Sequence, residues 1–318
     1  MRILIWHVHG SWMTGFVQGP DEYLIPVLPD RGPDGRGRAR TWDWPANARE
    51  LTPAELAEAD FDVVVLQRPE ELALVQRWTG RRPGIDVPAV YVEHNAPEPH
   101  PVLSRHHLAD REDIPVVHVT DFNALMWDSG RAPTTVVDHG VVDPGHLYIG
   151  SRARVAVVVN EPVRRGRMAG TDLVLGMAAR VPLEVYGMGT AELARLEPSL
   201  DGFIHDLSQA ELHRSIAHDR AYFHPYRWTS LGLSLIEAMM VGLPVLVVAS
   251  TQAPVAVPAA AGVVSPDPQV LQVTARRWLA DRDEAAERGR AARAHALATF
   301  GVERFLTDWQ AVLKEVVR

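Results

Sequence analysis

Residues 221–250 read AYFHPYRWTSLGLSLIEAMMVGLPVLVVAS, and this stretch decides the fold. Its first segment, residues 221–224, is a short apolar run that ends at a proline, which predicts a buried strand. Residues 233–240 then have the composition of a buried helix, and Gly242 and Pro244 predict where that helix ends. A second apolar run follows directly. The order of strand, bend, helix and strand is that of a βαβ unit.

Small residues occupy the bend between this strand and the helix. Thr229, Ser230 and Gly232 precede the helix, so the loop predicts main-chain N–H groups at a helix N-terminus. Such groups favour an anion, because the helix dipole adds positive potential there. Glu237 lies one helical turn beyond Leu233 and is expected to face the same place, where a carboxylate suits a pair of ribose hydroxyls. The bend therefore predicts a nucleotide site.

Outward from this unit, strands and helices alternate along the whole chain, which predicts parallel sheets. The strands expected in the second half are residues 155–159, 183–186, 221–224, 244–248 and 262–264, and two long helices follow at 269–298 and 302–317. The strands expected in the first half are residues 2–8, 61–66, 89–92, 115–119 and 134–137, with helices at 53–58, 70–78 and 121–128. Residues 29–40 are expected to form a mobile surface loop, and turn residues at 143–152 separate the halves. The pattern predicts an α/β protein of two Rossmann-like domains, with a ligand at the carboxyl ends of the strands.

Composition narrows the class of protein. The chain has 318 residues, of which 47% are hydrophobic and 23% charged, so it can build two full cores. Its net charge of −8 argues against a duplex nucleic-acid partner, and its lack of cysteine excludes disulfides and thiolate chemistry. No segment approaches the length of a membrane span. We expect a soluble cytoplasmic protein without a transmembrane segment.

Two short acidic patterns are the only candidates for a metal site. Asp60-Phe61-Asp62 precedes a predicted strand instead of ending one, and Asp281-Arg282-Asp283 lies within a predicted exposed helix. Both are interpreted as helix caps or solvated charges, and no metal is expected.

The central stretch resembles the donor-binding signature of family 4 glycosyltransferases and their GT-B relatives. The positions that match this signature in register are Gly232, Leu233, Glu237, Ala238, Met239, Gly242, Pro244 and Val245. Weaker matches are residues 134–143, 183–189 and 260–267 and the aromatic-rich ending from Phe300, and they occur in the family's order. The resemblance implies two Rossmann-like domains with parallel sheets facing a central cleft. Its expected parts are an acceptor-side domain at 1–148, a nucleotide-sugar domain at 149–300, and a terminal helix at 301–318 that crosses back.

The resemblance also implies an activity and a set of site residues. The activity is transfer of a sugar from a nucleoside diphosphate sugar to an acceptor, with retention of configuration and without a metal or a separate cofactor. The residues expected to bind the donor are Arg165, Gly187, Gly189, His205, Thr229, Ser230, Leu231, Gly232 and Glu237. Those expected to act in catalysis are His94, Arg164 and Arg167, and those expected on the acceptor side are His9, Gly10, Ser11 and Trp12.

Two positions depart from the family pattern. Thr229 stands where the family has a glutamate that contacts the transferred sugar, and Ala169 stands where it has a lysine that contacts the diphosphate. Nearby arginines can replace the lysine, because a guanidinium chelates phosphate oxygens with two parallel bonds. These departures leave two alternatives open: a nucleotide-sugar epimerase or hydrolase on the same fold, and a catalytically silent binding protein. The base, the sugar, the acceptor (small molecule, glycan or lipid-linked), the stereochemistry and the oligomeric state do not follow from the sequence.

Overall fold

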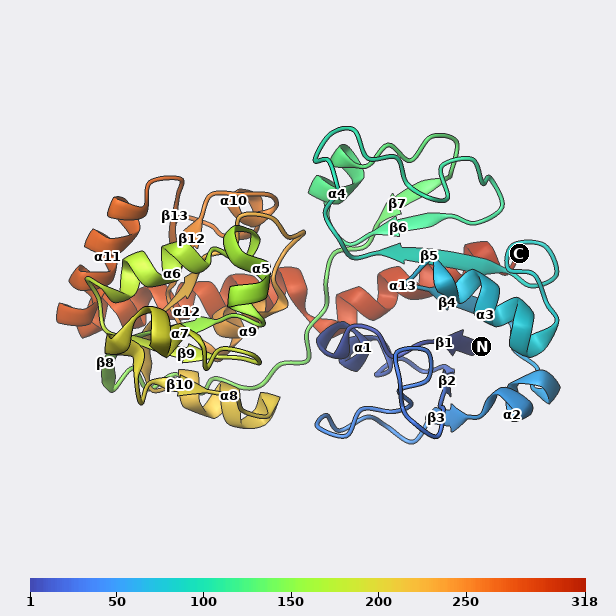
Figure 1. Ribbon diagram of the computed structural model, residues 1–318, viewed down its shortest axis with the longest axis horizontal. Helices are drawn as coiled ribbons and strands as arrows, with labels where there is room; N and C mark the ends of the chain where they lie inside the picture. Colours follow the sequence, from blue (N-terminus) through green and yellow to red (C-terminus); the bar gives the residue numbers. More distant parts are fainter. The chain divides into compact units, whose positions relative to one another are not determined.

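The computed structural model describes all 318 residues and divides into two compact units. The first unit comprises Met1–Val142 together with Val302–Arg318, and the second comprises Asp143–Gly301. Each unit is a parallel sheet with helices packed against it (Figure 1). An α/β architecture of two Rossmann-like halves is therefore confirmed.

The first unit is built on a seven-stranded sheet of order β3-β2-β1-β4-β5-β6-β7. Its strands are β1 (Arg2–Ile5), β2 (Glu22–Pro26), β3 (Ala48–Leu51), β4 (Val63–Leu66), β5 (Ala89–Glu93), β6 (Val116–His118) and β7 (Thr134–Val136). Its helices are α1 (Gly10–Phe16), α2 (Pro53–Glu58), α3 (Glu70–Thr79), α4 (Asp121–Met126) and α13 (Val302–Val316). Every strand pair is parallel, so all the strands end at the same edge.

The second unit is built on a six-stranded parallel sheet of order β10-β9-β8-β11-β12-β13. Its strands are β8 (Arg152–Val158), β9 (Leu183–Tyr186), β10 (Ile204–His205), β11 (Asp219–His224), β12 (Val245–Val248) and β13 (Gly262–Ser265). Its helices are α5 (Pro162–Ala169), α6 (Thr171–Ala178), α7 (Leu193–Leu196), η1 (Pro198–Leu200), α8 (Gln209–Ile216), α9 (Leu233–Val241), α10 (Ala253–Ala256), α11 (Pro268–Ala280) and α12 (Arg282–Phe300).

The sheet of the second unit is buried on both faces, which explains its continuous apolar strands. Alternate residues of β8, such as Val155 and Val157, face a core shared with α6 and α11, and Trp278 of α11 lies within that core. The opposite face contacts α8 and α9 through β11. None of the helices combines the length and the apolar character that a membrane span requires.

The last helix, α13, belongs to the first unit. Its buried residues Phe305 and Trp309 pack edge-on against the indole of Trp12 in α1, with ring centroids 5.8 and 5.6 Å apart. Gly140 lies directly under Phe305, and an added Cβ there would overlap the phenyl ring. The aromatic residues of the chain ending are therefore core residues of this unit.

The structure differs from the sequence-based expectations at several elements. Strands β2 and β3 and helices α1 and α8 were not predicted. The single helix expected at 269–298 is two helices, because Asp281 leaves the helical conformation and its side chain accepts from the amides of Asp283 and Glu284 at the start of α12. The loop at 29–40, expected to be mobile, is tied to β3 by a double hydrogen bond from Arg31 to Glu50 at 2.9 and 3.0 Å.

Neutral histidines lie inside both units. His118 at the end of β6 is 0% exposed and His224 at the end of β11 is 2% exposed. Burial lowers the pKa of His118 to about 4 and that of His224 to about 3. Protonation of these rings in the native state is thereby disfavoured, since a buried imidazolium loses its hydration.

Acid should therefore remove the stability that these two histidines contribute. Below pH 6.5 their imidazoles bind protons in the unfolded chain that the folded chain excludes, so their contribution to the free energy of unfolding falls as pH falls from 6.5 toward 3. His224 alone should contribute about 2 kcal/mol of this loss between pH 7 and pH 5. Urea unfolding at several pH values measures the slope, which His224→Gln should reduce. The exposed His100→Gln is the control, and an equal slope for both variants would contradict the account.

Candidate active site

The second sheet changes direction between β8 and β11. The chain winds outward from β8 through β9 to β10, then returns beside β8 with β11 and winds the other way to β13. Loops that leave two such neighbouring strands diverge to opposite faces and leave a crevice at the carboxyl edge, where open α/β sheets bind their ligands. The bend after His224 and the α5–α6 segment after β8 both start at this edge.

The two loops that leave this edge are joined to each other. Gly170, between α5 and α6, has a φ of +74°, and an added Cβ there would overlap the carbonyl oxygen of Pro225. Arg227 donates two hydrogen bonds to Asp172 at 2.5 and 2.8 Å, and its amide donates to the carbonyl of Met168 at 3.0 Å. The bend is thus held in one position against the start of α6, although the sequence alone identified neither Arg227 nor Asp172.

Helix α9 begins at Leu233, and its N-cap residue Gly232 provides no side-chain cap. The Leu235 amide donates to the Gly232 carbonyl at 3.0 Å, whereas amides before it in a first turn have no intrahelical acceptor and suit an anion. Gly232 is required here because an added Cβ would overlap the ring of His224. Behind the turn, the Tyr222 hydroxyl lies 3.0 Å from the Ser234 hydroxyl and fixes the first turn from the sheet side.

Glu237 lies on α9 with 5% of its surface exposed. Its two oxygens lie 2.8 Å from Gln209 Nε2 and 3.2 Å from His213 Nε2, and both partners come from the same face of α8. A carboxylate has about four acceptor positions, which suits a pair of ligand hydroxyls. Helix α8 is therefore the support of the expected ribose-binding carboxylate, and its two residues had no signal in the sequence.

Three arginines lie on α5 and differ in what they contact. The Arg165 guanidinium lies over the ring of Tyr226, 5.2 Å from its centroid, and so reaches the bend after β11. Arg164 pairs with Glu161 at 3.5 Å with 72% of its side chain exposed, and Arg167 pairs with Asp172 at 3.0 Å with 77% exposed. Of the three, Arg165 is the one the structure brings to the bend.

Other expected donor residues lie in the bend itself and at the ends of β9 and β10. Ser230 and Leu231 are buried and Thr229 is half-buried. Gly187 has a φ of +130°, and the amide of Met188 donates to Asn160 at 3.0 Å, which holds the glycine turn against the end of β8. His205 Nε2 lies 2.8 Å from the buried Glu184 carboxylate.

Gly189, the second glycine of that turn, has a φ of +67° and lies beside Glu161. The expected donor residues therefore lie in loops at the carboxyl edge of the second sheet, at the end of β10, and in α5 and α9, which follow that edge.

The first unit holds the residues expected for catalysis and for the acceptor. His94 follows β5 and is buried, and its ring centroid lies 4.1 Å from that of His9 and 5.0 Å from that of Trp12. Burial lowers the pKa of His94 well below its usual value, with further effects from His9 and His139. Burial also lowers the pKa of His9 to about 4, with Arg36 and Arg68 adding to the shift. Both rings are thus neutral at pH 7.

The remaining acceptor-side residues form the first turn of α1. The indole of Trp42 covers Gly10, so the small residue accommodates a ring of the protein itself. Ser11 is half-buried beside it. Trp12 is 0% exposed and packs on α13, which makes it a core residue instead of the wall of an acceptor site.

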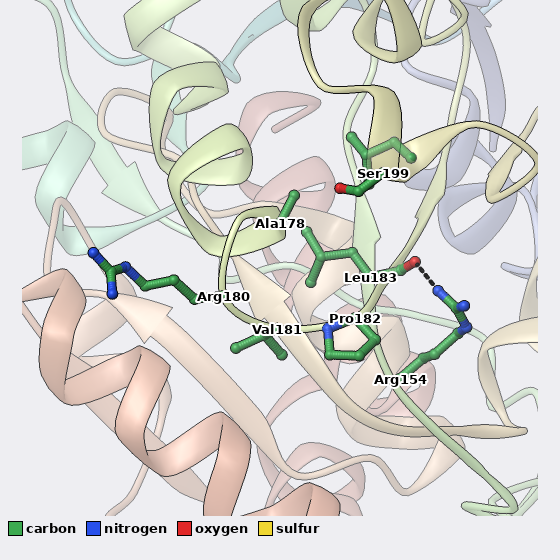
Figure 2. A pocket seen from close by; sticks show the side chains of 8 residues that line it. Arg154, Ala178, Arg180, Val181, Pro182, Leu183 and Ser199 are labelled. Carbon is green, nitrogen blue, oxygen red and sulfur yellow. Dashed lines mark hydrogen bonds between the residues drawn. The ribbon is translucent and has the colours of Figure 1, made fainter.

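One hollow on the surface of the second unit lies elsewhere. It has a volume of about 290 Å³ and is lined by Arg154, Pro182, Leu183 and Ser199 among others. Figure 2 shows Arg154 bonded to the Leu183 carbonyl, at 3.0 Å, and the Arg180 side chain pointing away. These residues lie at the amino-terminal side of β8 and β9, the edge opposite the bend, so the hollow is separate from the candidate site.

Comparison with known proteins agrees with this geometry. Residues 201–295, which include the bend and Glu237, match the family described as Glycosyl transferases group 1. No curated protein sequence matches the chain. Among solved structures, sucrose-phosphate synthase from Thermosynechococcus elongatus has a TM-score of 0.69 at 14% identity, with 99% of each chain covered.

Two further structures cover the full length. HepE of Anabaena, in complex with UDP and glucose, has a TM-score of 0.70 at 16% identity over 99% of this chain and 100% of its own. A glycosyltransferase from Rickettsia africae has a TM-score of 0.66 at 13% identity over 100% and 98%. These likenesses establish the fold, and the family match over 201–295 gives the activity class. The protein is a glycosyltransferase of the GT-B fold with a glycosyl transferases group 1 segment in its second unit.

Proposed function

We propose that the protein transfers a glycosyl group from a nucleoside diphosphate sugar to a hydroxyl-bearing acceptor, with retention of configuration and without a metal. The observation that carries the proposal is the bend after β11. It combines an uncapped helix N-terminus, a buried carboxylate one turn further on, and a guanidinium over Tyr226. The helix N-terminus suits the diphosphate, the carboxylate suits the ribose, and the guanidinium suits the charge of the leaving group.

Electrostatic stabilisation of the departing diphosphate is the main catalytic contribution in this proposal. Negative charge grows on the leaving oxygens as the glycosyl bond breaks, and the Arg165 guanidinium and the first-turn amides of α9 are fixed beforehand by packing. Preorganised dipoles of this kind need no rearrangement during the reaction. The fixed position of the bend, through Gly170 and Arg227, supports this role.

Uridine diphosphate is the first nucleotide to test, because HepE, which shares the fold, has been crystallised with UDP-glucose. Thr229 has a hydroxyl where the family has a carboxylate, so the donor sugar need not be glucose. A panel of UDP-sugars with and without hydroxyl acceptors therefore separates the candidate activities. Acceptor-dependent UDP release supports transfer, release without any acceptor supports a hydrolase, and binding without release supports a silent protein.

Glu237→Gln should raise the Kd for UDP at least about tenfold, because the amide accepts on one atom only and loses the charged acceptor. Calorimetric titration with UDP measures the effect, and the same variant should raise the donor KM in the assay above. Glu192→Gln, an exposed position in the same unit, is the control. Unchanged UDP affinity in Glu237→Gln would remove this carboxylate from the ribose site.

The three arginines of α5 should differ in their contribution. Arg165→Ala should raise the Kd for UDP about tenfold and weaken its dependence on salt, since a charge-assisted bond to phosphate is lost. Arg164→Ala and Arg167→Ala should have smaller effects, because these side chains are exposed and paired with Glu161 and Asp172. Arg180→Ala is the matched control in the same unit. A larger loss for Arg164 or Arg167 than for Arg165 would contradict the assignment.

A further inference from the structure

Gln67 lies between Trp6 and His94 at the carboxyl edge of the first sheet. It is the residue after β4, and β4 lies between β1 and β5 in the sheet. Trp6 follows β1 and His94 follows β5, so these three residues occupy adjacent strand ends. The Gln67 side chain bridges them, with Nε2 2.7 Å from the Trp6 carbonyl oxygen and Oε1 3.0 Å from His94 Nε2.

The chemistry of these partners fixes the orientation of the amide. A main-chain carbonyl oxygen only accepts hydrogen bonds, so the Gln67 atom that faces Trp6 must be the nitrogen. The amide oxygen therefore faces His94. Because that oxygen also only accepts, the hydrogen between them belongs to His94 Nε2.

The main chain of Gln67 is fixed by two hydrogen bonds. Its main-chain N–H donates to the buried Glu71 carboxylate at 2.7 Å, and its main-chain carbonyl accepts from the Tyr91 hydroxyl at 3.2 Å. Glu71 is in turn bound by Arg68 Nε at 2.9 Å. Only 3% of the Gln67 surface is exposed, and a flipped amide would place its oxygen against the Trp6 carbonyl oxygen.

We propose that Gln67 is a positioning residue that fixes His94 in the Nε2–H tautomer and so leaves Nδ1 as the ring atom that accepts hydrogen bonds. The tautomer follows from the contacts alone, and its use in catalysis rests on the proposed function. A neutral imidazole has one ring proton, so a proton on Nε2 leaves the lone pair on Nδ1. The opposite tautomer would place two acceptors against each other at 3.0 Å inside the protein.

The tautomer can be read directly in the intact protein labelled with ¹⁵N-histidine. Two-bond ¹H–¹⁵N correlations distinguish a protonated ring nitrogen from an unprotonated one, and the His94→Gln spectrum identifies the His94 signal. We expect a single Nε2–H form in the wild type at pH 7 and a mixture in Gln67→Met, which has a similar shape but no acceptor. Gln76→Met, an exposed position on α3, should leave the signal unchanged.

An Nδ1–H form or a mixture in the wild type would overturn the proposal, even if Gln67→Met fails to fold. Retention of one tautomer in a folded Gln67→Met would also overturn it. With the UDP-sugar that the panel identifies as donor, Gln67→Met should lower kcat about tenfold while the Kd for UDP is unchanged, a split that general loss of structure would not give. A protein without turnover that still has the expected tautomer would remove the proposed function and leave the positioning role of Gln67.

Discussion

The contact between Gly170 and Pro225 is the constraint on which the candidate site depends. The parallel sheet brings the ends of β8 and β11 to one edge, but strand order alone does not place the loops that follow them. Gly170 allows main chain to meet main chain without a side chain between, and the Arg227–Asp172 pair closes the same junction. With the bend so fixed, the start of α9 and the Glu237 carboxylate have defined positions, as a preorganised anion site requires.

Buried polar side chains in both units are hydrogen-bonded to groups on neighbouring elements. Burying such a group is costly unless it has a partner, and both units satisfy this rule by linking groups across neighbouring elements. In the second unit, α8 supplies Gln209 and His213 to Glu237. In the first unit, Gln67 joins the ends of three strands through one amide. These links give the site residues a single orientation, which is the property a catalytic group needs before any substrate arrives.

The sequence was sufficient for the central elements of the fold and insufficient for its edges. The apolar runs of the strands and the glycine and proline after α9 are local signals, and they predicted β8, β9, β11, β12 and β13, whereas the two-residue β10 was not predicted. Strand β3 was missed because Arg49 and Glu50 are polar and the segment is short, and α1 was missed because two glycines lie in its seven residues. The break between α11 and α12 depends on one side-chain cap at Asp281. It was not predicted because the residues on both sides have a helical composition.

The candidate site was also predictable only where its residues are close together in the sequence. Glu237 and the bend belong to one continuous stretch, whereas Arg227 with Asp172, Gln209 with His213, and Gln67 with His94 are pairs that only the folded chain brings together. Trp12 was expected to line an acceptor site and is a core residue, since the amphipathic ending of the chain that covers it is almost 300 positions away in the sequence.

A crystal structure of the protein soaked with UDP tests the central claim most directly. The account predicts density for the diphosphate beside the amides of residues 232–234, with the Arg165 guanidinium on a phosphate oxygen and the ribose hydroxyls on Glu237. Density for the nucleotide at any other place, with this bend unoccupied, would contradict it.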